Sequence, residues 1–219
     1  MTSKPAAVLW DMDGTLVDTE PYWIDTEYEM ARTYGGEWTK DDALTLVGND
    51  LLQSGRYIKQ RMGLPHTPEE VVELLLDGVC ARIDADVPWR PGARELLEDL
   101  RAHQVPCALV TMSYQRFVAP ILAHLRAETF TVIVTGDQVR NGKPHPEPYQ
   151  TAAAALGLEP SRCLAIEDSN TGAKSAESAG CTVLVVENHV PVLPGERRVF
   201  RPTLAGLGAT DLPELLPPR

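Results

Sequence analysis

The sequence of 219 residues contains few cysteines, and none of them forms a recognisable metal-binding pattern. No C-x-x-C pair and no Cys/His spacing typical of a zinc site occurs, which argues against zinc. The four cysteines are far apart and lie mostly in apolar runs, which favours buried, reduced thiols. They are Cys80, Cys107, Cys163 and Cys181.

Long apolar runs and an excess of positive charge are also missing. Met1–Pro5 leads directly into a short apolar segment without the apolar stretch of a signal peptide, and no run is long enough to span a bilayer. Lys and Arg number 20 against 31 Asp and Glu, a formal net charge of −11. Nucleic acids and anionic membranes usually bind basic surfaces. We therefore expect a soluble, cytoplasmic protein whose partner is neither nucleic acid nor membrane.

Two patterns of hydrophobicity divide the chain. Short apolar runs alternate with helical patterns from Pro88 onward, which predicts a parallel sheet covered by helices on both faces. The apolar run Ala6–Trp10 belongs with this sheet. Expected strands after it are Cys107–Thr111, Phe130–Thr135, Cys163–Glu167 and Thr182–Val186; expected helices are Ala93–His103, Tyr114–Leu125, Pro146–Leu156 and Gly172–Ala179.

The stretch between Thr19 and Asp86 is helical in pattern, with no convincing strand. One helix is expected from Thr19, as its cap, to Tyr34, and a second from about Asp50 to Met62. A third starts at Thr67, where Thr67 and Glu70 form a T-x-x-E capping box. Its apolar face carries Val72, Leu75, Leu76, Val79 and Ile83.

The fold predicted is therefore α/β, a Rossmann-like parallel-sheet core with an inserted all-helical cap domain. The core is expected to comprise residues 1–18 and 88–219, and the cap residues 19–87. The last stretch, Val190–Arg219, is rich in proline and is expected to end in a short helix near Asp211–Leu216.

Residues whose side chains are suited to catalysis lie at the ends of the predicted strands. Ligands of an open parallel sheet bind beyond the carboxyl ends of its strands. A carboxylate there is often a turn or cap residue, and a lone lysine is usually solvated. The joint placement of carboxylates, a hydroxyl and a lysine at one edge of the sheet instead indicates phosphoryl transfer. The residues are Asp11 and Asp13 after the first strand, Thr111 at the end of the second, Lys143 in the loop after the third, and Glu167 and Asp168 at the end of the fourth.

The charges of this group imply a cation. Four carboxylates face the single positive charge of Lys143, so they would repel one another and a phosphate dianion. A hard divalent ion bound by oxygen atoms removes this conflict, and Mg²⁺ is favoured where phosphate is present.

The segment Asp11-Met12-Asp13-Gly14-Thr15-Leu16-Val17-Asp18-Thr19 is followed in order by Thr111, Lys143-Pro144 and Glu167-Asp168. Together they resemble the four motifs of the haloacid dehalogenase superfamily. The resemblance covers nearly the whole chain, including a helical cap after the first motif. It is closest to the β-phosphoglucomutase-like and sugar-phosphate phosphatase branches.

This resemblance implies a role for each residue. Asp11 would be the nucleophile that forms an aspartyl-phosphate, and Asp13 the general acid and then base. Thr111 would bind a phosphoryl oxygen, and Lys143 would bridge the phosphate and Asp11. Mg²⁺ would be held by the Asp11 carboxylate, the Asp13 carbonyl and Asp168, with Glu167 orienting the site or adding a water-mediated contact. The Lys143–Pro144 bond is expected to be cis.

The function predicted is Mg²⁺-dependent hydrolysis of a small, sugar phosphate-like monoester. A phosphosugar mutase and a non-catalytic binding protein remain alternatives. A dehalogenase is disfavoured, because a halide leaves without protonation and needs no Mg²⁺. In relatives that are mutases, a histidine and basic residues of the cap bind the second phosphate. Here Trp23 stands at the histidine's place, and the expected cap loop reads Gly48-Asn49-Asp50.

The composition of the expected cap also bears on the substrate. Between Pro21 and Val87 there are six Lys or Arg and thirteen Asp or Glu. These charges can simply form solvated helix faces. If instead they face the site, such a segment is poorly suited to substrates with several anionic groups. The sequence gives no indication of the oligomeric state.

Overall fold

The computed structural model describes residues 5–46 and 51–216, and its contacts separate two compact units. The first, the sheet unit, comprises the described residues of Met1–Asp18, Trp89–Gln115 and Leu125–Arg219. The second, the helical unit, comprises those of Thr19–Pro88 and Arg116–His124.

Arg116–His124 lies in the range expected for the core, yet it groups with the helical unit. The Arg116 guanidinium pairs with Glu73 and Asp77 of that unit. The Phe117 ring packs edge-on against Trp23, with 5.3 Å between ring centroids.

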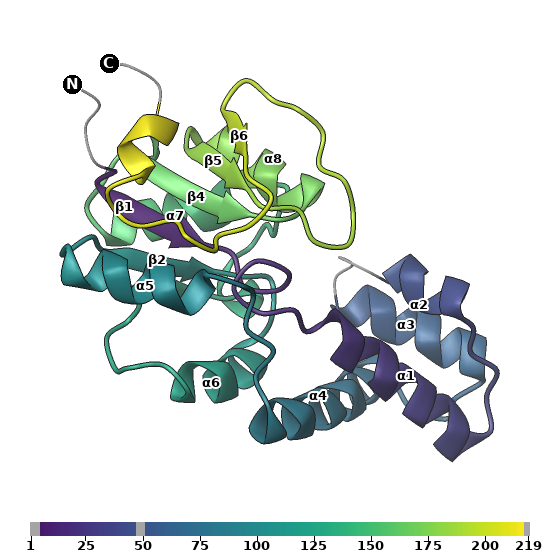
Figure 1. The fold of residues 1–219 in the computed structure, drawn as a ribbon. Coiled ribbons are helices and arrows are strands. Elements are labelled where there is room, and N and C mark those ends of the chain that lie inside the picture. The colour runs from purple at the N-terminus through teal and green to yellow at the C-terminus, as the bar shows by residue number, and fades with distance from the viewer. Residues whose placement is uncertain (1–4, 47–50, 217–219) are drawn as a thin grey trace. The chain divides into compact units, whose positions relative to one another are not determined.

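The sheet unit is built on a parallel sheet with the order β3-β2-β1-β4-β5-β6 (Figure 1). Its strands are β1 (Ala7–Trp10), β2 (Cys107–Val110), β3 (Val132–Val134), β4 (Cys163–Glu167), β5 (Thr182–Val185) and β6 (Arg198–Phe200). Trp10 of β1 pairs with Leu109 on one side and Ile166 on the other, so β1, β2 and β4 end at the same edge. The predicted parallel α/β sheet is confirmed.

Helices cover both faces of this sheet. They are α5 (Ala93–Ala102), α7 (Glu147–Ala155) and α8 (Asn170–Ala179). α7 and α8 pack together on one face, where alanines allow close approach, and α5 lies on the other (Figure 1). Ser169 caps α8 by accepting a hydrogen bond from the Gly172 N–H at 3.0 Å.

The helical unit contains α1 (Glu20–Tyr34), α2 (Lys40–Leu46), α3 (Leu51–Met62), α4 (Pro68–Ala85) and, from Arg116 onward, α6 (Gln115–Ala123). The capping box of Thr67 and Glu70 is present, and the five predicted apolar positions of α4 are buried. Thr19 occupies the N-cap of α1 but makes no capping bond with its side chain, because its backbone is already helical. The expected loop Gly48-Asn49-Asp50 lies outside the described residues.

Two elements were not predicted, namely α2 and β6. α2 has only 7 residues, too few to show a helical period, and it is held by contacts between Asp42 and Thr39 at its start. β6 has 3 residues in a proline-rich segment, and it exists because it pairs with β5. The expected helix at Asp211–Leu216 is a short 3₁₀ turn, Leu212–Leu215. Further 3₁₀ turns lie at Gly136–Gln138 and Pro160–Arg162.

The cysteines and the length of the helices were also considered in the sequence. All four thiols are free, and Cys107, Cys163 and Cys181 are buried while Cys80 is half-buried. Within residues 5–46 and 51–216, none of the helices has the length and apolar character needed to cross a bilayer.

Candidate active site

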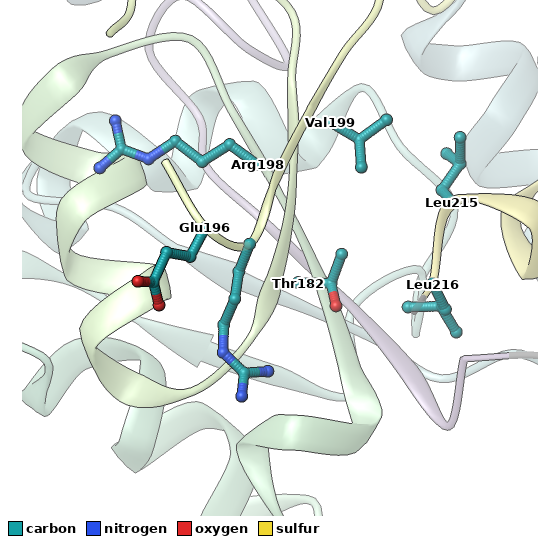
Figure 2. Close-up of a pocket in the computed structure, with 7 residues that line it drawn as sticks. Thr182, Glu196, Arg198, Val199, Leu215 and Leu216 are labelled. Carbon is teal, nitrogen blue, oxygen red and sulfur yellow. The ribbon is translucent and has the colours of Figure 1, made fainter. Parts of the chain in front are cut away.

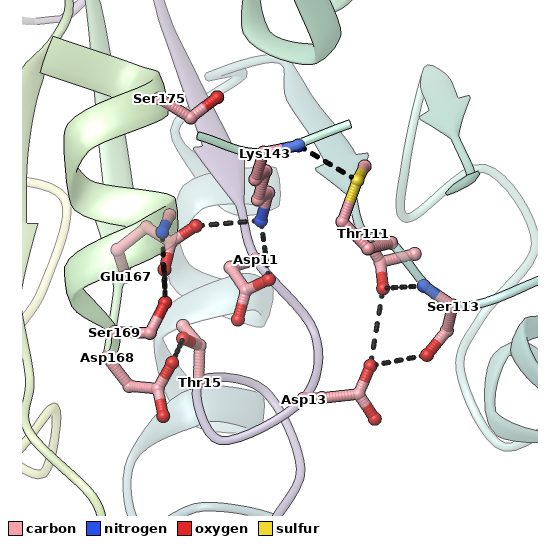
Figure 3. A network of polar contacts seen from close by, with 12 residues as sticks. Asp11, Asp13, Thr15, Thr111, Ser113, Lys143, Glu167, Asp168, Ser169 and Ser175 are labelled. Atoms are coloured by element: carbon pink, nitrogen blue, oxygen red, sulfur yellow. Dashed lines mark hydrogen bonds and ion pairs between the residues drawn. The ribbon is translucent and has the colours of Figure 1, made fainter. Parts of the chain in front are cut away.

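The predicted site residues meet at the carboxyl edge of the central strands. Asp11 directly follows β1, whose neighbours β2 and β4 lie on opposite sides of it. This is the point at which the strand order changes direction, where open α/β sheets bind ligands. Figure 3 shows the side chains converging there from β1, β2, β4 and the Lys143 loop.

A buried ion pair forms the centre of the site. The Lys143 ammonium donates to Asp11 Oδ1 and to Glu167 Oε1, both at 2.7 Å. The Lys143 side chain is only 6% exposed. Burial alone would lower the pKa of Lys143, but the negative charges of Asp11 and Glu167 outweigh it and raise that pKa. Lys143 therefore remains a cation in the site.

Several contacts fix the loop that carries Lys143. The Ser175 hydroxyl of α8 donates to the His145 carbonyl at 2.6 Å. The Glu147 carboxylate accepts hydrogen bonds from the Arg140 and Asn141 backbone N–H groups at 2.8 and 3.1 Å. The Lys143–Pro144 bond is cis, as predicted. The loop thus presents Lys143 to the end of β1.

Glu167 is fully buried, and several donors surround its carboxylate. Tyr149 of α7 donates its hydroxyl to Oε1 at 2.6 Å, and the Ser169 hydroxyl donates to Oε2 at 3.2 Å. With Lys143, these donors occupy both oxygens. The sequence analysis missed Tyr149, although a tyrosine on the apolar face of an alanine-rich helix signals a buried hydroxyl that needs a partner.

Asp13 lies on the other side of the site, beside β2. Its Oδ2 accepts hydrogen bonds from the Ser113 hydroxyl at 2.7 Å and from the Thr111 hydroxyl at 3.3 Å (Figure 3). The Ser113 backbone N–H in turn donates to the Thr111 Oγ1 at 3.0 Å. Ser113 was not singled out from the sequence. Its position two residues after Thr111 is the only sequence signal for it.

The acidic residues fit a hard divalent cation. Asp11, Glu167 and Asp168 each offer an oxygen, and these atoms lie within 4.8 Å of one another. Asp11 Oδ2 is buried and accepts no hydrogen bond from the described part of the chain. Burial raises the pKa of Asp11 and of Asp168, and the charge of Glu167 raises both further, although Lys143 lowers them. The charge of Asp11 also raises the pKa of Asp168. A bound cation would relieve this cost.

Glycine at position 14 makes room for the Asp168 carboxylate. A Cβ there would lie 2.0 Å from Asp168 Oδ2, and the φ of +88° also disfavours other residues. On the same carboxylate, Oδ1 lies 3.5 Å from the Thr15 hydroxyl. The first motif therefore supplies both Asp11 and the space for Asp168.

A cavity of about 400 Å³ lies elsewhere in the sheet unit (Figure 2). It borders Thr182 and Arg198, the first residues of β5 and β6, and so lies toward the opposite end of the strands from Asp11. The Arg198 guanidinium is paired with Glu177, with Nη2 2.9 Å from Oε2. This cavity therefore has no part in the chemistry of the carboxylates.

Comparison with known proteins gives a consistent assignment. The model of the family described as haloacid dehalogenase-like hydrolase matches residues 8–186. A protein named "Phosphorylated carbohydrates phosphatase" from Thermotoga maritima is 34% identical over 184 residues, covering 80% of this chain and 81% of that protein.

Two solved structures show the same fold. CbbY from Rhodobacter sphaeroides in complex with phosphate has a TM-score of 0.82 at 24% identity, covering 96% of this chain and 99% of that one. A putative β-phosphoglucomutase from Thermotoga maritima has a TM-score of 0.73 at 29% identity, covering 89% and 92%.

Proposed function

The chain belongs to the haloacid dehalogenase-like hydrolases, and from this premise we propose that it is a phosphatase acting on a small phosphomonoester. The observation that carries the proposal is the buried pair of Lys143 and Asp11, joined at 2.7 Å. A carboxylate held in this way beside a permanent cation is suited to attack phosphorus, because the ammonium offsets the charge of the phosphoryl group.

The reaction would proceed in two displacements. An Asp11 oxygen forms a bond to phosphorus while the ester P–O bond breaks, giving an aspartyl-phosphate and an alkoxide that takes a proton from Asp13. Asp13 then accepts a proton from water, whose oxygen attacks phosphorus and releases inorganic phosphate and free Asp11. Each step is easier than direct displacement by water.

Asp13 needs a fixed position to exchange these protons. The hydroxyls of Ser113 and Thr111 hold its carboxylate beside β2. Thr111 would also bind an oxygen of the phosphoryl group, since its hydroxyl lies at the end of β2 beside the reacting carboxylates.

Asp11 and Asp168, with the carbonyl of Asp13, are the ligands we propose for Mg²⁺. Glu167 would act in an outer position, because Lys143, Tyr149 and Ser169 already occupy its oxygens. When bound, the ion neutralises the carboxylates and the phosphate and so allows the anionic substrate to approach.

The substrate class we propose is a small phosphorylated metabolite, such as a sugar phosphate. The name of the Thermotoga maritima phosphatase supports this class, while the fold likeness to a putative β-phosphoglucomutase keeps a mutase as the second candidate. We further propose a cytoplasmic location, where buried free thiols such as Cys163 stay reduced.

A phosphate-release screen tests the proposal. The purified protein is incubated with sugar phosphates, nucleotides and simple phosphomonoesters, with and without Mg²⁺. We expect release of phosphate from at least one small monoester, and only with the metal. Absence of release from every compound in the presence of Mg²⁺ would favour a non-catalytic binding protein.

A further inference from the structure

The Tyr149 hydroxyl has no place in the chemistry described above. The side chain is fully buried in α7, and its hydroxyl lies 2.6 Å from Glu167 Oε1. The same oxygen accepts a hydrogen bond from the Lys143 ammonium at 2.7 Å. Two donors from different elements therefore share one buried oxygen.

This sharing affects how Lys143 divides its hydrogen bonds. The ammonium has two carboxylate partners at equal distance, Glu167 and Asp11. A hydroxyl that donates to Glu167 Oε1 offsets part of the charge on that oxygen and weakens its hold on Lys143. Without the hydroxyl, Glu167 would attract the Lys143 ammonium more strongly, and the contact between Lys143 and Asp11 would weaken.

Glu167 itself has little freedom to adjust. A Cβ on Gly172 would lie 1.9 Å from Glu167 Oε1 and 2.1 Å from Oε2, so the carboxylate rests against the backbone of α8. The Ser169 hydroxyl holds its other oxygen. If the charge on Glu167 Oε1 changes, the longer, unbranched side chain of Lys143 must therefore move, and not the Glu167 carboxylate.

We propose that Tyr149 is a positioning residue that keeps Lys143 shared between Glu167 and Asp11. Its hydroxyl acts through Glu167, whereas its ring, 5.1 Å from the Lys143 ammonium, is kept in Tyr149→Phe. The inference rests on the proposed function, since it concerns the cation that assists attack by Asp11. It makes the Tyr149 hydroxyl of α7, a helix outside the four motifs, necessary for full activity.

The kinetic test compares Tyr149→Phe with Tyr57→Phe. Both changes remove one hydroxyl that donates to a carboxylate, since the Tyr57 hydroxyl donates to Asp42 Oδ1 at 2.8 Å in the helical unit. We expect Tyr149→Phe to lower kcat about tenfold with KM within about twofold, because the misplaced cation is needed in the transition state. Tyr57→Phe should leave both constants unchanged. Equal effects of the two variants would overturn the inference.

A double-mutant cycle separates positioning from loss of packing. Because Tyr149 acts through Glu167, Tyr149→Phe should lower kcat in the wild-type background and have no further effect in Glu167→Gln. Losses that multiply would contradict the inference. Inactivity of the wild-type protein toward every phosphomonoester would count against the proposed function instead.

A crystal structure of Tyr149→Phe tests the geometry without activity. We expect Lys143 to keep its contact with Glu167 and to lie farther than 2.7 Å from Asp11 Oδ1. An unchanged Lys143–Asp11 contact would overturn the inference even if kcat falls.

Discussion

The ammonium of Lys143 lies 2.7 Å from a carboxylate oxygen of Asp11, although 132 positions separate the two residues in the sequence. β1 brings Asp11 to the edge of the sheet, and a loop anchored by Ser175 brings Lys143. The contact places a permanent cation against a buried carboxylate whose second oxygen has no hydrogen-bond donor among the described residues.

Asp11→Asn should abolish phosphate release while leaving the fold intact. The amide is nearly the same size as the carboxylate but is a far weaker nucleophile, so we expect a loss of at least about a thousandfold in kcat. Single-turnover assays and a thermal melt on the same sample measure both effects. Substantial residual turnover would assign the attack to water or to another residue.

Removal of divalent metal should stop turnover. Asp11 and Asp168 are buried together and repel each other. Their negative charges would also repel the phosphate of the substrate unless a cation is bound. We expect EDTA to abolish activity and Mg²⁺ to restore it. Asp168→Asn, as a matched variant, should require a higher Mg²⁺ concentration for half-maximal rate. Full activity of the metal-free protein would refute this mechanism.

The enzyme should release phosphate and not isomerise sugar phosphates. The resemblance seen in the sequence predicts that Trp23 replaces the histidine of the mutases, and Trp23 packs against Phe117 and the apolar core of the helical unit. Phosphorus NMR with β-glucose 1-phosphate and a trace of bisphosphate primer distinguishes the products. We expect inorganic phosphate without glucose 6-phosphate. Accumulation of the 6-phosphate with little free phosphate would establish a mutase.

The stability of the helical unit should depend on the ionisation of Glu27. Burial raises the pKa of this carboxyl to about 8, although a hydrogen bond from Trp38 at 3.2 Å lowers it and the charge of Glu20 raises it. The folded state therefore holds its proton more tightly than the unfolded chain does. The contribution of protonated Glu27 to the free energy of unfolding is complete below pH 4.5, the ordinary pKa of a glutamate. This contribution is lost as the pH rises from there to about 8.

Glu27→Gln removes this dependence and keeps an acceptor for the Trp38 N–H. We expect the variant to match the wild type near pH 4 and to exceed it by about 2 kcal/mol near pH 8. Urea unfolding across that range measures the difference. A constant difference at every pH would show that Glu27 does not titrate in this window.

Much of the sheet unit could be predicted from the sequence. Buried parallel strands are continuous apolar runs, so β1 and β4 were recognised within one residue of their observed bounds. The first motif is local, because Asp11 and Asp13 follow β1 directly, and Gly14 is required by the turn. The Thr67 capping box was also predictable, since a cap depends on residues three positions apart.

Tertiary structure decided what depends on long-range contacts. β6 has too few residues to be recognised without its partner β5, and α2 shows no period of its own. The sequence placed Lys143 and Glu167 in one site. It did not show that the Lys143 ammonium and the Tyr149 hydroxyl donate to the same oxygen of Glu167, nor that Ser113 holds Asp13. Such contacts join side chains from separate elements. The pairing of β1 with β2 brings Ser113 to Asp13, and the packing of α7 on the sheet brings Tyr149 to Glu167.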